Sequence, residues 1–120
     1  MRIFAGQPVR PYQMHRAYEG NAVRIDIRSL DFDNEPEAPS TLQYRIDNLT
    51  DAVAVQDWTS VNTPGENSTV TISAATNQMY TNYRDVQLMQ VTFKATYSDG
   101  TQAQVIGCYE LARLYQGFSS

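Results

Sequence analysis

The 120-residue chain contains one cysteine and one histidine, and this scarcity excludes several kinds of chemistry. Cys108 has no partner for an internal disulfide, so the fold must be stable in a reducing compartment. A zinc site needs several cysteine or histidine ligands, which two such residues cannot supply. A catalytic triad needs a base beside its nucleophile, and His15 lies in a segment without a predicted packed scaffold. We expect Cys108, in the last predicted strand, to be a buried or half-buried inert thiol.

The sequence also lacks paired carboxylates and a glycine-rich phosphate loop. Asp26, Asp47 and Asp57 stand apart on predicted strands or at their ends, and nothing pairs them for acid–base catalysis. We therefore expect no enzymatic activity and no cofactor.

Long apolar runs and basic stripes are absent as well. No run approaches the roughly 20 apolar residues that span a bilayer, and residues 1–16 lack the apolar core of a secretory leader. The net charge is −4, opposite in sign to that of a typical nucleic-acid-binding domain. We expect neither a membrane nor a nucleic acid as a partner.

After Gly20 the chain shows apolar residues at every second position, which is typical of half-buried strands. The alternation covers residues 23–30, 41–47, 53–58, 68–73, 88–97 and 101–111. Asp99-Gly100 predicts a tight hairpin of type I′ between the last two runs. Residues 73–79 predict a short helical turn with Ser73 as its N-cap. Strands of this number and spacing favour an antiparallel β-sandwich or barrel.

Two loop regions raise specific questions. Residues 44–58 predict a strand, a reversal at Asn48–Asp51 and a second strand that ends near Trp58. Closing the core or covering an edge of the sheet is the favoured role of Trp58, and anchoring of an interface is the alternative. The loop of residues 31–37 holds four acidic residues, which we interpret as a solvated loop, although dense oxygen ligands also suit calcium.

The first 18 residues differ from the rest in charge. They carry three arginines and no acidic residue, whereas residues 19–120 carry six basic and thirteen acidic residues, a net charge of −7. Pro8 and Pro11 exclude a regular helix across the middle of the segment. We predict an extended N-terminal arm over residues 1–19 that binds an acidic surface of a partner or of another copy. The candidate partner-binding residues are Arg2, Phe4, Arg10, Tyr12, Met14, Arg16 and Tyr18. The alternative is a short first strand packed on its own domain.

Residues 44–79 carry a recognisable pattern. Tyr44-Arg45-Ile46-Asp47 is followed by Asp57-Trp58-Thr59 and then by Val70-Thr71-Ile72. The pattern resembles immunoglobulin-like or fibronectin-III-like modules of tailed-bacteriophage virion proteins, and the resemblance extends over about residues 23–114. The chain departs from antibody domains because it lacks their paired cysteines.

The resemblance implies an all-β, antiparallel Ig-like β-sandwich of about six to eight strands over residues 20–114, with a C-terminal tail at 115–120. It also implies a virion protein made in the host cytoplasm. The expected function is a capsid cement or decoration protein whose partners are the major capsid protein or other virion subunits, with homo-oligomers in the assembly. Alternatives are a head–tail or tail adaptor, a cytoplasmic peptide-binding adaptor, and a carbohydrate-binding sandwich that uses Tyr80, Tyr83, Tyr115 and Phe118.

Overall fold

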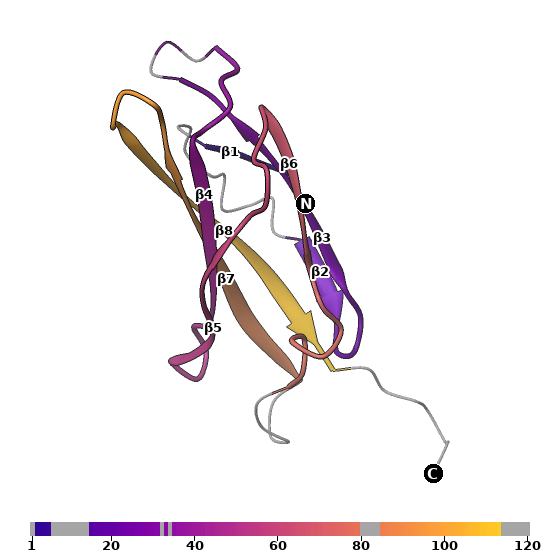
Figure 1. Cartoon of the computed structure of the whole chain (residues 1–120). Coiled ribbons are helices and arrows are strands. Elements are labelled where there is room, and N and C mark those ends of the chain that lie inside the picture. The colour runs from indigo at the N-terminus through magenta and orange to yellow at the C-terminus, as the bar shows by residue number, and fades with distance from the viewer. Residues whose placement is uncertain (1, 6–14, 32, 34, 80–84, 114–120) are drawn as a thin grey trace.

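The computed structural model describes residues 2–5, 15–31, 33, 35–79 and 85–113, and of residues 2–5 it describes the backbone. All regular elements of this part of the chain are strands, arranged in two sheets (Figure 1). The strands are β1 (Arg2–Ala5), β2 (His15–Tyr18), β3 (Val23–Ser29), β4 (Thr41–Asn48), β5 (Val53–Ser60), β6 (Asn67–Ile72), β7 (Val86–Thr96) and β8 (Gln102–Ala112). The described residues contain no helix that is long and apolar enough to cross a membrane.

The strands divide into a three-stranded sheet in the order β1-β3-β6 and a five-stranded sheet in the order β2-β8-β7-β4-β5. The longest strands, β7 and β8, pair over eleven positions in the middle of the larger sheet. This all-β, two-sheet architecture agrees with the prediction of a β-sandwich.

The apolar residues of the period-two pattern form the core between the sheets. Val91 and Phe93 of β7 are fully buried, and they contact a cluster built from both sheets. Burying each such side chain contributes roughly 1.5–3 kcal/mol, so the alternation accounts for much of the fold's stability. The other largest buried apolar side chains are Ile25, Ile27, Leu42, Ile46, Ile72, Met89, Tyr109 and Leu111.

The N-terminal segment differs from the predicted arm. β1 pairs with β3 and β2 pairs with β8, so residues 2–5 and 15–18 are edge strands of the two sheets. Both pairings are parallel, whereas we predicted an antiparallel fold throughout. These pairings give partners to backbone groups that β3 and β8 would otherwise expose along one side. Residues 2–5 and 15–18 thus pair with strands of their own chain, which agrees over these residues with the alternative of a short first strand packed on its own domain.

The β7–β8 hairpin is confirmed, but its turn is not of type I′. That turn needs positive φ at both central residues, and only Gly100 has one, at 89°. The amide of Gly100 donates to the carbonyl of Tyr97 at 2.9 Å. Asp99 instead uses its side chain, which accepts hydrogen bonds from the amide and the hydroxyl of Thr101 at 2.9 and 2.6 Å.

Two other predicted turns are confirmed. The hydroxyl of Ser73 accepts a hydrogen bond from the amide of Thr76 at 3.2 Å, which is the N-cap contact. In the β4–β5 reversal, the side chain of Asn48 donates to the carboxylate of Asp51 and accepts from its amide. Ala52 completes this reversal with a φ of 54°.

Candidate protein-interaction surface

The outer face of the five-stranded sheet points away from the smaller sheet and is the broadest regular surface of the described residues. Arg16 and Arg45 on this face each pair with a carboxylate of the same face. Arg16 contacts Glu110 at 2.8 Å at one end, and Arg45 contacts Asp47 at 2.8 Å at the other. Between these pairs lies a neutral stretch of β7 and β8 that includes Ile106, which is 45% exposed.

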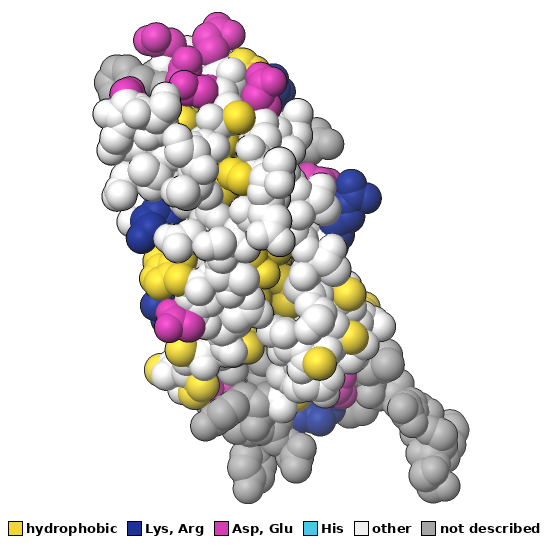
Figure 2. Space-filling model, in the orientation of Figure 1, with side chains coloured by type: hydrophobic (Ala, Val, Ile, Leu, Met, Phe, Trp, Pro, Cys, Tyr) yellow, Lys and Arg dark blue, Asp and Glu magenta, His cyan; other side chains and the backbone are white. Residues whose placement is uncertain are grey.

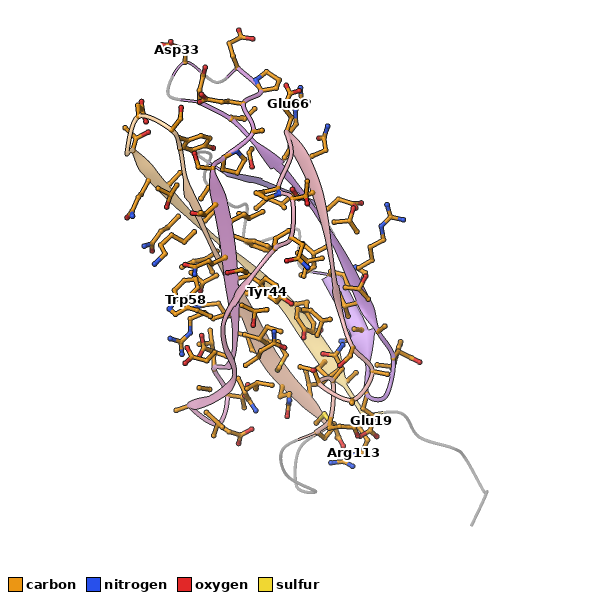
Figure 3. All side chains as sticks on the ribbon, viewed as in Figure 1. Glu19, Asp33, Tyr44, Trp58, Glu66 and Arg113 are labelled. Atoms are coloured by element: carbon orange, nitrogen blue, oxygen red, sulfur yellow. The ribbon has the colours of Figure 1, made fainter. Side chains whose placement is uncertain are left out.

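Trp58 stands near one side of this face, in a group that we call the Trp58 cluster: Arg45, Asp47, Trp58 and Lys94. The ammonium group of Lys94 lies 4.8 Å from the centre of the indole ring, and the guanidinium of Arg45 lies 5.9 Å from it. Such cation–π contacts contribute about 0.5–1 kcal/mol at exposed sites. Figure 3 shows Trp58 on the outer side of the sheet, whereas Tyr44 lies between the two sheets.

Trp58 therefore does not close the core, but it lies on β5, an edge strand of the five-stranded sheet, where the expectation also allowed it to cover an edge. Its side chain is half-buried and does not belong to the core cluster. A register shift explains the difference. Tyr44 pairs with Thr59 and Ile46 pairs with Gln56, so Asp57 and Trp58 together lie opposite Arg45. A bulge of this kind redirects a side chain, and here it places the indole beside Arg45 on the outer face.

Arg45 is fixed by a forked contact with the carboxylate of Asp47. Its Nε and Nη2 atoms donate to the two carboxylate oxygens at 3.0 and 2.8 Å. The hydrogen bond and charge of Asp47 raise the pKa of the Arg45 guanidinium, so this group stays charged. A fixed, planar cation beside a half-exposed indole is a common composition of protein-interface centres.

A hollow of about 340 Å³ adjoins the Trp58 cluster at the β4–β5 reversal. Leu49 lies at its rim and is 43% exposed. The lining residues are Arg45, Asp47, Asn48, Leu49, Ala52, Val53 and Ala54. The hollow and the indole together offer an apolar anchor with charged groups beside it.

The candidate residues of the predicted arm do not form one site in the structure. β1, which contains Arg2 and Phe4, lies in the smaller sheet, whereas Arg16 and Tyr18 lie in β2 at the edge of the larger sheet. Arg16 is exposed and paired with Glu110, and Tyr18 is 43% exposed. The remaining candidates, Arg10, Tyr12 and Met14, lie outside the described residues, as do Tyr80, Tyr83, Tyr115 and Phe118.

Cys108 is half-buried in β8, as predicted. Burial raises the pKa of its thiol, which keeps the sulfur protonated and weakly nucleophilic at neutral pH.

Acidic side chains gather at the end of the domain formed by the β3–β4 loop (Figure 2), where Figure 3 labels Asp33 and Glu66. One carboxylate oxygen of Asp31 accepts hydrogen bonds from the amides of Asp33 and Glu35 at 2.8 and 2.9 Å. Asp31 thus shapes its own loop. Within the described ranges, no group of three or more His, Cys, Asp or Glu residues is placed to hold a metal ion.

The sequence interpretation missed the partners of Trp58. Arg45 and Lys94 both occupy polar positions in strands whose apolar and polar residues alternate. This pattern is enough to predict that both side chains lie on the outer face. Nothing local in the sequence indicates that the register shift in β5 brings Trp58 to the same place.

Comparison of the chain with protein-family models finds no match, and comparison with curated proteins finds no significant similarity.

Proposed function

We propose that this protein is a non-enzymatic structural protein of a phage virion, specifically a capsid cement or decoration protein with an immunoglobulin-like fold. The observation that carries the proposal is the Trp58 cluster. Tyr44, Arg45, Asp47 and Trp58 belong to the sequence pattern that resembles phage virion modules. The last three of them meet on one outer face, with the indole half-exposed.

Strand order supports the Ig-like part of the proposal. In one sheet of an immunoglobulin-like sandwich, the last strand lies next to the strand that precedes it in the chain. That strand lies next to the third strand, and an added strand can lie on the other side of the third. Here the order β8-β7-β4-β5 follows that scheme, and β3 and β6 supply the opposite sheet. The parallel pairing of β1 with β3 is a departure in the first strand.

The outer face suits a protein partner better than a nucleic acid. Its arginines are engaged by Glu110 and Asp47, and Lys94 lies over the Trp58 ring, so the face does not form the basic patch that would suit phosphates. We propose that the Trp58 cluster and the adjoining hollow form the centre of the contact with the capsid subunit, where buried Trp and Arg side chains typically contribute most of the binding energy.

Purified particles of the source phage test the role. A decoration protein is expected at a fixed, high copy number relative to the major capsid protein, measured by quantitative mass spectrometry. A head–tail or tail adaptor would occur at only a few copies for each particle. Absence from purified particles would overturn the virion assignment.

Binding to particles prepared without this protein tests the surface. We expect Trp58→Ala to weaken co-sedimentation with these particles by at least about 30-fold, corresponding to a hot-spot loss of roughly 2 kcal/mol. Val55→Ala, at an exposed position of the same strand, is the matched control and should bind like the natural chain. Equal binding by both variants would show that the contact lies elsewhere.

A further inference from the structure

The four edges of the two sheets differ in how they are protected. β5 shifts register twice against β4, and such bulges disturb the pairing of a further strand. β1 and β2 are only four residues long. β6 is six residues long and pairs with β3 without a register shift, so among the described strands it presents the longest regular edge (Figure 1).

The direction of the backbone groups of β6 follows from its pairing. The amide of Ser29 donates to the carbonyl of Glu66 at 2.9 Å, which makes residues 29 and 66 a hydrogen-bonded pair. In an antiparallel ladder such pairs alternate with non-bonded pairs, so Ser68, Val70 and Ile72 direct their amides and carbonyls toward β3. The amides and carbonyls of Asn67, Thr69 and Thr71 therefore point away from the sheet.

The side chains of β6 offer none of the usual obstacles to strand addition. The sequence Asn-Ser-Thr-Val-Thr-Ile contains no charged residue, no proline and no glycine. Natural edge strands are commonly blocked by charges, prolines or bulges. The outer face of β6 carries Thr69 and Thr71, and threonine is favoured in paired strands.

We infer that β6 pairs antiparallel with β6 of a second copy of this chain, about a two-fold axis at Thr69. In this register Thr69 lies opposite Thr69 of the second copy, and Asn67 lies opposite Thr71. All three outward amides and all three outward carbonyls of each strand then have partners, because the spacing of residues 67, 69 and 71 is symmetric about Thr69. The two small sheets join into one continuous sheet of six strands.

Charge is compatible with this pairing. The nearest charged side chain in line with Thr69 is Asp26 on β3, which accepts a hydrogen bond from the Thr69 hydroxyl at 3.0 Å. Across the joined sheet the two Asp26 residues are three strand spacings apart, about 14 Å. This distance exceeds the Debye length of roughly 8–10 Å, so their repulsion is screened. The inference concerns association of the chain with itself and does not depend on the virion assignment.

Sedimentation velocity from about 1 µM to about 1 mM tests the dimer. Thr69→Pro removes the outward amide without touching the ladder to β3, and proline is tolerated where an edge amide faces away from its sheet. We expect it to weaken dimerisation by at least about tenfold, since two hydrogen bonds across the axis are lost. Thr69→Ala is the matched control: it also loses the contact with Asp26, but it keeps the amide and should still dimerise.

Cross-linking tests the register without a proline. In a Cys108→Ser background, Thr69→Cys places two thiols on residues whose Cα atoms are about 5.5 Å apart, within reach of a short thiol cross-linker. Thr71→Cys separates them by four residues along the strand, about 13 Å, and should not cross-link. A chain that stays monomeric over the whole concentration range overturns the inference. Cross-linking of Thr71→Cys in preference to Thr69→Cys overturns it as well.

Discussion

At the scale of single residues, the alternation along β7 separates positions that tolerate charge from those that do not. Val91 is fully buried between the sheets, and its neighbour Thr92 is on the outer face opposite Arg45. We expect Val91→Asp to prevent folding, because an unpaired carboxylate in the core costs several kcal/mol. Thr92→Asp should leave the thermal midpoint nearly unchanged. Circular dichroism melts compare the two, and similar behaviour of both variants would contradict the assignment of faces.

Tyr109 is a second residue whose side chain contributes to the stability of the fold. Its hydroxyl donates to the side-chain carbonyl of Asn77 at 2.6 Å, and the amide of that side chain donates to the carbonyl of Asn21 at 2.8 Å. These two hydrogen bonds thus connect β8 to the turn after β6 and to the segment before β3. Removing the hydroxyl leaves a buried acceptor with one partner fewer.

The pH dependence of stability follows from the same residue. Burial raises the pKa of Tyr109 above its ordinary value of 10.0, so the folded protein keeps the proton where the unfolded chain has lost it. The contribution of Tyr109 to the free energy of unfolding should therefore be constant below about pH 10 and fall as the pH rises further. Tyr109→Phe should lower stability by about 1–3 kcal/mol at neutral pH and flatten this alkaline decline. Urea melts at pH 8 and pH 11 measure both effects, with Tyr18→Phe as the exposed control. A decline equally steep in Tyr109→Phe would assign it to other groups.

At the scale of elements, the hairpins combine side-chain and backbone conformation. Gly100 adopts a φ of 89°, which an L-residue with a Cβ atom adopts at a cost, and no atom lies within 4 Å of the place a Cβ would take. We expect Gly100→Ala to destabilise the protein by about 1 kcal/mol through backbone strain alone. Ser98→Ala, in the same turn, should change stability by less than about 0.5 kcal/mol. Equal thermal midpoints for Gly100→Ala and the natural chain would contradict this account of the turn.

The acidic β3–β4 loop permits a direct test of the calcium alternative. One carboxylate oxygen of Asp31 accepts hydrogen bonds from the amides of Asp33 and Glu35, and these contacts organise the loop without a cation. We therefore expect the thermal midpoint to be the same in EDTA and in millimolar calcium. A rise of several degrees in calcium would show that the loop binds a cation that stabilises the fold.

The elements also show where sequence reasoning succeeds. Strands β3, β4, β6, β7 and β8 follow from period-two alternation, because burial on one face imposes that period. The reversal at Asn48 and the cap at Ser73 follow from local side-chain chemistry. The position of Trp58 does not follow, because it depends on a register shift between β4 and β5 that no local pattern encodes.

At the scale of the whole molecule, charge is distributed unevenly. The charges of the broad outer face are largely paired, whereas the acidic residues of the β3–β4 loop project from one end (Figure 2). The chain has a net charge of −4, and the end that carries this loop is the place where acidic side chains gather in the view of Figure 2.

The N-terminal segment is the other feature of the whole molecule that the sequence left open. Its sequence shows no regular periodicity. The two strands in it, β1 and β2, are short and belong to different sheets, so no single alternation runs through the segment. Strand pairing to β3 and β8 is a non-local property, and the composition of residues 1–18 indicated only their positive charge. An excess of arginine is compatible both with a free arm and with an edge strand whose arginine pairs with an acidic neighbour, as Arg16 does with Glu110.

Deletion of residues 1–18 separates these two roles. The deletion removes β1, β2 and the buried Ala17, and it leaves the eleven-residue strand β8 as an unprotected edge. We expect the thermal midpoint to fall by roughly 10 °C or more and the truncated chain to aggregate through that edge. A truncated chain that does not aggregate and is as stable as the full chain would show that these strands contribute little to the fold. The double variant Arg16→Ala, Tyr18→Ala is the matched control, because it alters only exposed side chains. It should melt within a few degrees of the natural chain, so that any loss of particle binding in this variant reports on β2 as a contact surface and not on folding.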